Sequence, residues 1–159
     1  MSSSVGPAVA NFLSIATAAV PATIANEGAT QIAFGELPEY LAPVTIQILE
    51  VTGDAKVAEL GVNFRREETY AIVVEIMTWA GDQNFVQRFQ DAMTIYNELV
   101  VAVATNPWLS TSGLNDSTAA VRIAEIGDFS IVPHADKLGQ SRCSLQFHVR
   151  CSQRVDSLD

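Results

Sequence analysis

The first regular pattern in the chain is a series of apolar residues that recur at steps of three and four. Its members are Val9, Phe12, Leu13, Ala16 and Val20. This spacing predicts a helix with one apolar face. Ser4 is a suitable N-cap, and Pro21 ends the helix because proline lacks the backbone N–H that a helix interior uses.

Alternation with a period of two follows in the next part of the chain. A short extended stretch at 31–34 precedes a strand-like run at 44–51, and residues 52–54 (Thr-Gly-Asp) have the composition of a turn. Residues 55–64 show no clear period. We interpret them as a loop or a projecting arm.

The strongest strand pattern runs from Arg65 to Trp79. One of its faces carries Tyr70, Ile72, Val74 and Ile76, and the other carries Ala71, Val73, Met77 and Trp79. A strand that is apolar on both faces is usually central in its sheet and covered on both sides. We therefore expect this strand in the middle of a sheet, ended by Gly81-Asp82.

A long helix is predicted from Asn84 to Thr105, followed by the stop signal Asn106-Pro107. Its apolar stripe is continuous and consists of Phe85, Phe89, Ala92, Met93, Tyr96, Leu99, Val100 and Val103. A stripe of this kind is typical of a helix that covers the face of a sheet. We expect all of it in the core.

Two strands are predicted near the C-terminus. The first includes 120–126, and a loop at 133–139 leads to the second. In the second strand Cys143, Leu145, Phe147, Val149 and Cys151 alternate with Arg142, Ser144, Gln146, His148 and Arg150. This alternation indicates a half-buried strand whose polar face meets water or a partner, and we expect it to pair antiparallel with 120–132.

The order of elements is helix, strands, long helix, two strands, which predicts an α+β fold with a largely antiparallel or mixed sheet. A length of 159 residues suits a single domain, 1–159. Hydrophobic residues make up 48% and charged residues only 17%, which favours a folded protein with some surface covered by other chains.

The net charge of −9 argues against nucleic-acid binding, because gripping DNA needs clustered Lys and Arg. No segment has the 18 apolar residues of a membrane span, and the N-terminal stretch lacks the basic residues of a secretion signal. The two cysteines suggest no disulfide framework. We expect a protein made in the cytoplasm.

Catalytic and metal-binding patterns are weak. His148 lies on the opposite strand face from Cys143 and Cys151, so these groups cannot form a nucleophile and base pair within the strand. Zinc-site spacings and phosphate-binding glycine loops are missing. We expect no cofactor, no metal and no enzymatic activity, with both cysteines in the core.

A composite pattern between 62 and 109 gives a more specific lead. It consists of Arg65-Arg-Glu-Glu-Thr-Tyr70 entering a strand, then Gly81-Asp82, then the long helix containing Arg88, then Asn106-Pro-Trp-Leu109. This run resembles tail terminator (tail completion) proteins of bacteriophages with long non-contractile tails. The flanking elements follow the same order, and the resemblance extends over about residues 5–155.

The resemblance implies a subunit of a homohexameric ring in the virion. Such a ring caps the tail tube, stops its growth and provides the docking surface for the head-tail connector, with no cofactor. Its partners are other copies of the chain, the major tail tube protein and the connector or stopper protein. DNA passes through the channel without specific binding, and no membrane is involved.

A ring needs one patch that binds a different patch on the next copy, and exposed sheet edges and long loops supply such patches. The polar face of the last strand is our candidate for contact with a neighbouring copy, and the arm at 53–66 and the loop at 110–118 are our candidates for contact with the tube or the connector. The interface residues predicted from them are Asp54, Lys56, Glu59, Arg65, Arg66, Glu67, Glu68, Asp116, Arg142, Gln146, His148 and Arg150.

Other functions stay open from the sequence. One alternative is another neck or head-tail connector component, or a tail tube subunit that forms filaments. A second alternative, from a different class, is a small ligand-binding or catalytic α+β domain. That alternative requires a pocket of several hundred Å³ with convergent polar groups.

Overall fold

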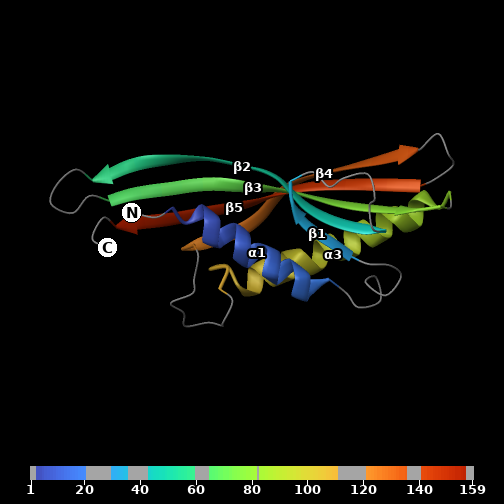
Figure 1. Ribbon diagram of the computed structural model, residues 1–159, viewed down its shortest axis with the longest axis horizontal. Coiled ribbons are helices and arrows are strands. Elements are labelled where there is room, and N and C mark those ends of the chain that lie inside the picture. The colour runs from blue at the N-terminus through green and yellow to red at the C-terminus, as the bar shows by residue number, and fades with distance from the viewer. Residues whose placement is uncertain are drawn as a thin grey trace.

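The computed structural model describes residues 3–20, 30–35, 43–59, 65–81, 83–110, 121–135 and 141–156. In these residues two helices pack against one five-stranded sheet, which confirms the predicted α+β fold (Figure 1). The helices are α1 (Val5–Ala19) and α3 (Phe85–Thr105). The strands are β1 (Thr30–Phe34), β2 (Val44–Glu59), β3 (Arg65–Ala80), β4 (Ile123–Ala135) and β5 (Ser141–Asp156).

The sheet has the strand order β1-β2-β3-β5-β4. β1 is parallel to β2, and all other neighbours are antiparallel, so the sheet is mixed as expected. β3 is the middle strand, which confirms its prediction from apolar residues on both faces. The predicted antiparallel pairing of the last two strands is also confirmed.

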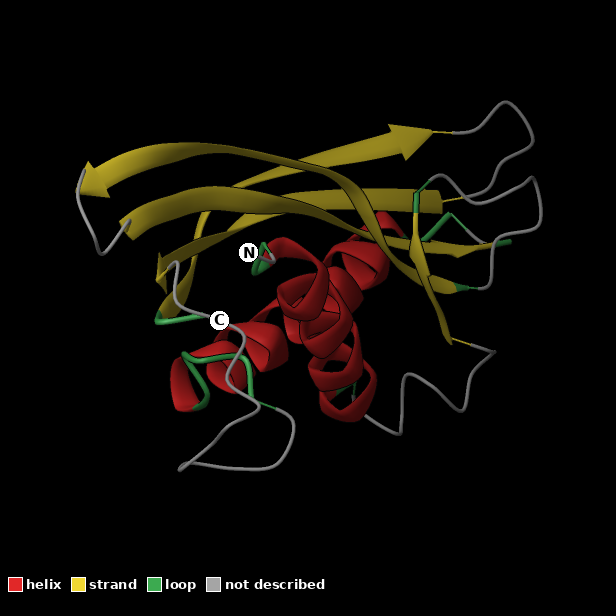
Figure 2. Cartoon of the chain, turned by 60° about the vertical axis from the view of Figure 1, so that its left-hand side comes forward, coloured by secondary structure: helices red, strands yellow, loops and turns green. Residues whose placement is uncertain are grey.

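Both helices lie on the same face of the sheet (Figure 2). Their buried residues, such as Phe12 and Leu99, pack on the alternate strand residues that form the core. The fully buried strand residues include Ile46, Ile48, Ile72, Val74, Ile76, Leu145, Phe147 and Val149. The described helices cover only one face of β3 (Figure 2), although Val73 and Glu75 on its other face are also buried, each 8% exposed.

The prediction of a turn at 52–54 is wrong, because β2 continues through this segment to Glu59 and pairs with β3. Gly53 lies opposite Tyr70, and a Cβ added to Gly53 would come within 2.3 Å of the Tyr70 Cβ. The glycine therefore allows a close approach inside a strand, which is a common reason for strand glycines. The predicted arm is mostly a two-stranded hairpin, and residues 60–64 lie outside the described part.

Helix α3 has the predicted bounds, and its N-cap Asn84 accepts a hydrogen bond from the Gln87 N–H at 3.1 Å. Two residues of the expected core stripe are nevertheless exposed, Phe85 by 36% and Phe89 by 45%. β3 ends at Ala80, and its Thr78 donates a hydrogen bond to the Arg88 carbonyl. The first turn of α3 therefore lies beside the end of β3, where part of its apolar stripe stays exposed.

The predicted loop at 133–139 begins too early, because β4 continues to Ala135 and includes Pro133 and His134. Proline is tolerated there because β4 is an edge strand in the described sheet, where an N–H directed away from the sheet is dispensable. An irregularity in the pairing between Gly127 and Ser130 bends the strand in its middle.

Candidate interaction surface

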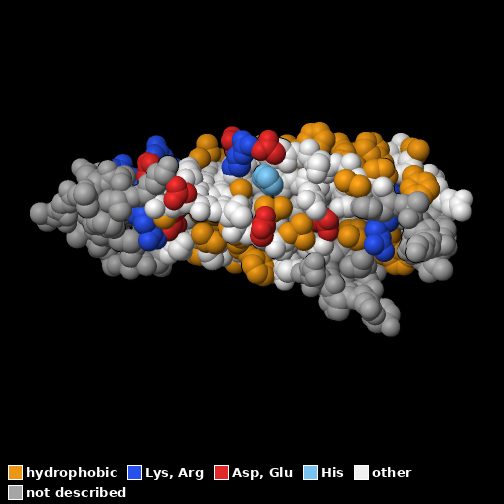
Figure 3. All heavy atoms as spheres, turned by 90° about the horizontal axis from the view of Figure 1, so that it is seen from above, with side chains coloured by type: hydrophobic (Ala, Val, Ile, Leu, Met, Phe, Trp, Pro, Cys, Tyr) orange, Lys and Arg blue, Asp and Glu red, His pale blue; other side chains and the backbone are white. Residues whose placement is uncertain are grey.

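The sheet face opposite the helices, which we call the open face, carries the side chains that alternate with the core positions. Its central residues come from β2, β3 and β5 and include Thr45, Gln47, Val73, Glu75, Ser144, Gln146, His148 and Arg150. Charged side chains of both signs are mixed with hydrophobic ones over the described part of this face (Figure 3). Non-obligate protein interfaces have about the same mixture of side chains as the rest of a protein surface, so this composition is compatible with a contact site.

Glu75 lies at the centre of a polar network in the middle of the open face. The residue is only 8% exposed. Its carboxylate accepts hydrogen bonds from Gln47 Nε2 at 2.5 Å, from Ser144 Oγ at 2.8 Å and from Gln146 Nε2 at 3.1 Å. The donors come from the strands on either side of β3. The network is held by neutral donors, and it fixes the orientation of these polar side chains on the open face.

A second polar cluster lies where β4 bends. Asp128 has a positive φ of 50°, and its carboxylate forms an ion pair with Arg150. His148 Nδ1 lies 3.9 Å from the same carboxylate. All three side chains are substantially exposed, so salt screens their interactions. The cluster places the Arg150 guanidinium beside β4, at one border of the open face.

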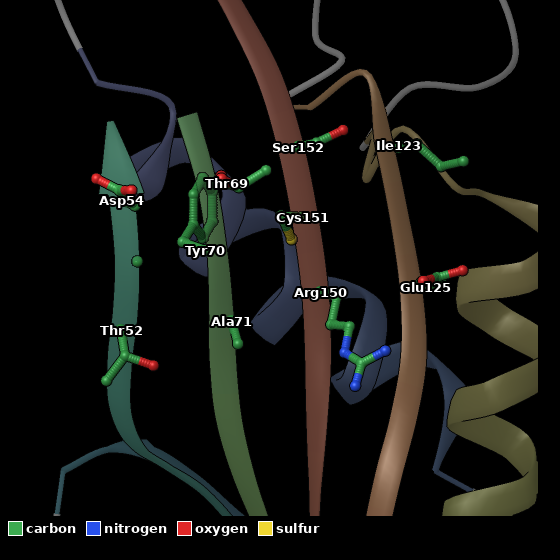
Figure 4. Close-up of a pocket in the computed structure, with 11 residues that line it drawn as sticks. Thr52, Asp54, Thr69, Tyr70, Ala71, Ile123, Glu125, Arg150, Cys151 and Ser152 are labelled. Atoms are coloured by element: carbon green, nitrogen blue, oxygen red, sulfur yellow. The ribbon is translucent and has the colours of Figure 1, made fainter. Parts of the chain in front are cut away.

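A groove of about 580 Å³ crosses the hairpin end of the open face. Figure 4 shows its lining residues on four strands, with Thr52 and Asp54 on β2 at one side and Ile123 and Glu125 on β4 at the other. Small residues such as Gly53 and Ala71 form part of its lining. The groove therefore gathers residues of β2, β3, β5 and β4 in one place.

Glu68 lies on the other face of β3 and joins the hairpin to the start of α1. Its carboxylate accepts hydrogen bonds from the Ser4 N–H at 3.0 Å and the Ser4 hydroxyl at 2.9 Å, and it pairs with Arg66. Burial alone would raise the pKa of Glu68, but these hydrogen bonds and the Arg66 charge outweigh it and hold the pKa below its ordinary value. Ser4 therefore anchors α1 through Glu68 and does not form the predicted side-chain cap.

The predicted interface residues occupy several different positions. Asp54 and Glu67 are exposed, and Glu68 is buried within the subunit. Arg142, Gln146, His148 and Arg150 share the open face, as the alternation predicted. Lys56, Glu59 and Arg65 lie in the paired hairpin, where their side chains are outside the described part, as is the whole of Asp116. Arg66 is half-buried on the helix side.

The cysteines lie in the core as predicted, exposed by 1% at Cys143 and 3% at Cys151. Burial raises the pKa of Cys151 to about 12 and also raises the pKa of Cys143. Neither thiol is therefore ionised at neutral pH. Within the described ranges, no three potential metal-ligating side chains gather in one place.

Sequence reasoning missed Glu75 and Asp128 as polar centres of this surface. A signal for Glu75 was present, because it is the one acid inside the apolar run from Ala71 to Trp79. Asp128 gave no usable signal, since its position depends on a bend in β4.

Neither described helix has the length and apolar content needed to cross a bilayer.

No known family profile matches the chain, and no curated protein matches it. Among solved structures, a chain from a structure described as "Virion of native gene transfer agent (GTA) particle" is similar, with 15% sequence identity and a TM-score of 0.48. The alignment covers 88% of this chain and 93% of that chain.

Proposed function

We propose that this chain is a structural subunit of a tailed-phage virion that closes into a ring, a homohexamer by resemblance, on the end of the tail tube. The ring ends tube polymerisation and presents a docking surface to the head-tail connector. The observation that carries this proposal is the two-layer fold, in which the described helices cover one face of the sheet and the other face carries charged, polar and apolar side chains mixed together (Figures 2 and 3).

Exposed apolar side chains at separate places support an assembling subunit. Phe85, Val86 and Phe89 are exposed at the start of α3, and Ile123 and Val132 are exposed on β4. Patches that differ in this way suit a heterologous contact, in which one surface binds a different surface on the next copy. Such contacts generate a closed ring when the rotation between copies closes.

The acidic balance fits a ring through which DNA passes. With 18 acidic and 9 basic residues, the subunit repels phosphates more than it attracts them. A channel lined by such subunits would let DNA move without sticking. Under this proposal the protein has no catalytic role and acts only through its contacts with protein partners.

The oligomeric state of the pure protein tests the proposal. We expect closed rings of one size in negative-stain electron microscopy and a single discrete assembly by mass photometry as concentration rises. Filaments of unlimited length would instead indicate a tail tube subunit. A strict monomer at all concentrations, which also leaves the length of polymerising tail tubes unchanged, would contradict the proposal.

The tube-capping step needs its own measurement. Adding the protein to polymerising tube protein from the same virion should shorten the tubes and place one extra ring at one end. A ring that binds the connector but has no effect on tube length would indicate a different neck component. This comparison separates the tail terminator from the structural alternative.

The groove is the reason to consider ligand binding as a second candidate function. Its volume of about 580 Å³ meets the size expected of a ligand pocket. Its acidic and basic lining residues Asp54, Glu125 and Arg150 are exposed, however, and Arg150 is paired with Asp128 outside the lining. Binding of a small molecule that requires these side chains, in a protein that never assembles, would favour this candidate.

A further inference from the structure

Phe34 is an exposed aromatic residue on an outer strand of the described sheet. It lies on β1, with 65% of its surface exposed, and it pairs with Ile48 of β2. Residues paired in this way share a face of the sheet, and Ile48 is a fully buried core residue. Phe34 is therefore directed to the helix side of the sheet, like Ile32 two residues earlier, which packs on the core.

Phe129 is a second exposed aromatic residue, and a bulge in β4 determines where it lies. Two residues of β4, Asp128 and Phe129, stand opposite the single residue Phe147 of β5. An extra residue of this kind redirects the side chains around it. The ring of Phe129 packs on Tyr96 of α3 with a centroid distance of 5.3 Å, and 56% of the residue is still exposed. Phe129 therefore also lies on the helix side of the sheet.

Contacts on both faces of the sheet hold this bulge. Asp128 has a φ of 50°, a left-handed conformation that residues other than glycine rarely adopt. Local strain of this kind persists only where the surrounding contacts maintain it. The Asp128 carboxylate pairs with Arg150 on the open face, and Phe129 packs on Tyr96 on the helix side. These contacts together fix the position in which Phe129 is displayed.

The two phenylalanines lie at opposite ends of one row of the sheet. The row begins with Phe34 on β1, continues through Ile48, Val74 and Phe147, and ends at the bulge that contains Phe129. Both side chains therefore lie on the same side of the sheet, at the same height along the strands, on opposite borders of the described part. If the next copy is related by a rotation with little axial rise, its Phe34 comes to lie beside Phe129 of the first copy. A heterologous contact needs two different patches of this kind, and it gives a ring when the rotation closes.

Helix α3 extends the surface around Phe129 into what we call the aromatic strip, which consists of Phe85, Phe89, Tyr96 and Phe129. The three helix residues recur on one face of α3 at steps of four and seven, and Phe85 and Phe89 are exposed. The strip contains no charged residue, and α3 carries only three among its 21 residues. A shortage of charge and a high content of aromatic residues distinguish the centre of a protein interface from ordinary surface.

The exposed area of these residues fits the centre of a contact between copies. On average about half of each of the four phenylalanines Phe34, Phe85, Phe89 and Phe129 is exposed. With about 200 Å² for a large aromatic side chain, they present roughly 400 Å² together. This is about a quarter of the roughly 1,600 Å² that a standard interface buries, and a polar rim supplies the rest of such an interface.

We propose that copies of this chain join through Phe34, which packs into the aromatic strip of the next copy beside Phe129. This proposal rests on the proposed ring and specifies the contact that closes it. The partner is a second copy because the two patches lie at matching heights on opposite borders of the same sheet. The contact is made by side chains and requires no pairing of backbone groups between copies.

Two variants, each lacking one side of the contact, test it when they are mixed. Phe34→Asp keeps the aromatic strip, and Phe129→Asp keeps Phe34. Each change alone should raise the concentration for half-assembly by at least about tenfold, because it places a charge in an apolar contact. An equal mixture should form dimers in sedimentation velocity, through the one intact patch of each variant, but no rings. Val101→Asp makes the same change on the exposed side of α3 away from the strip and should leave assembly unchanged.

The outcomes separate this contact from the ring itself. If the wild type forms rings and Phe34→Asp forms them equally well, the contact is wrong and the ring remains. A mixture that stays monomeric at the highest soluble concentration also rules out the contact. If the wild type never assembles, both proposals are wrong. Because Phe129 packs on Tyr96, circular dichroism should first show that Phe129→Asp is folded, and Phe89→Asp takes its place in the mixture if it is not.

Photo-cross-linking tests the geometry independently. Replacing Phe34 with p-benzoylphenylalanine keeps an aromatic side chain and adds a photoreactive ketone. Within one chain Phe34 and Phe129 are four strand spacings apart, roughly 19 Å, which is beyond the reach of this group. Irradiation of the assembled protein should therefore link position 34 to residues 123–135 or to the first turns of α3 in the next copy, as mass spectrometry of the linked peptides would show. Links from position 34 to other segments only would contradict the contact.

Discussion

At the scale of single residues, two buried acids of β3 have different environments on its two faces. Glu68 faces the helices and is stabilised by hydrogen bonds from Ser4 and by the charge of Arg66. Glu75 faces the open side and is held by neutral donors. Both carboxylates therefore fix neighbouring elements in place, and removing either would leave buried donors without partners.

We predict that Glu68→Gln lowers the free energy of unfolding by about 1–2 kcal/mol at pH 7, because hydrogen bonds to a charged group are lost. The pKa of Glu68 in the folded state is below its ordinary value of 4.5, so its carboxylate stabilises the fold above that pH. This contribution disappears as the pH falls through the folded-state pKa. Urea unfolding of both proteins should therefore show a difference that shrinks below about pH 4.5.

Gly53 and Gly127 give a matched pair of glycine substitutions in strands. Gly53→Ala would place a Cβ 2.3 Å from the Tyr70 Cβ and 2.7 Å from the Thr69 carbonyl oxygen, so the strands must separate. We predict a loss of about 1–3 kcal/mol in thermal unfolding. Gly127→Ala meets only the Arg150 guanidinium at 3.7 Å and should change the stability of the monomer by less than about 0.5 kcal/mol. Equal effects of the two changes would refute this explanation.

At the scale of elements, period and composition were sufficient for α1, β3, α3 and β5. These segments carry long, uninterrupted patterns, and the structure has them where they were predicted. The far half of β2 could not be predicted, because Gly53 has the composition of a turn and its real role depends on Tyr70 in the neighbouring strand. The exposure of Phe85 and Phe89 depends on which tertiary contacts the start of α3 makes, and the helical period does not encode those contacts.

Helix α3 stabilises the fold through its central and C-terminal turns. Leu99 is fully buried, whereas Val101 is 58% exposed on the same helix. We predict that Leu99→Ala costs about 2–5 kcal/mol, because it leaves a cavity between helix and sheet. Val101→Ala should cost less than about 0.5 kcal/mol in the same urea titration. A large effect at Val101 would show that partner chains cover this side of the helix in the measured state.

At the scale of the whole molecule, the sequence predicted a polar face on the last strand but could not predict the full candidate surface. Arg142, Gln146, His148 and Arg150 are identified by alternation alone. The groove requires residues from β2, β3, β5 and β4 at one height, and this depends on the register of pairs far apart in the sequence. Local patterns contain no information about such a register.

The charge of the whole molecule predicts its behaviour toward nucleic acid. Because the net charge is −9, we expect the protein not to bind a fluorescent DNA duplex at physiological salt, at protein concentrations up to roughly 100 μM. Fluorescence anisotropy would measure this, with a basic DNA-binding protein as the positive control. Micromolar binding that weakens steeply as salt increases would contradict the expectation and reveal a cationic surface formed on assembly.

The pairing of β3 with β5 also has a consequence for how the protein is made. Arg65 pairs with Asp156 and Ala80 pairs with Ser141, so the middle of the sheet joins segments from distant parts of the chain. The β2–β3 hairpin can form soon after it leaves the ribosome, but one side of β3 stays unpaired until β5 has been synthesised. Nascent chains therefore expose one side of β3 through the later part of translation, which makes chaperone contact with this strand valuable to the cell.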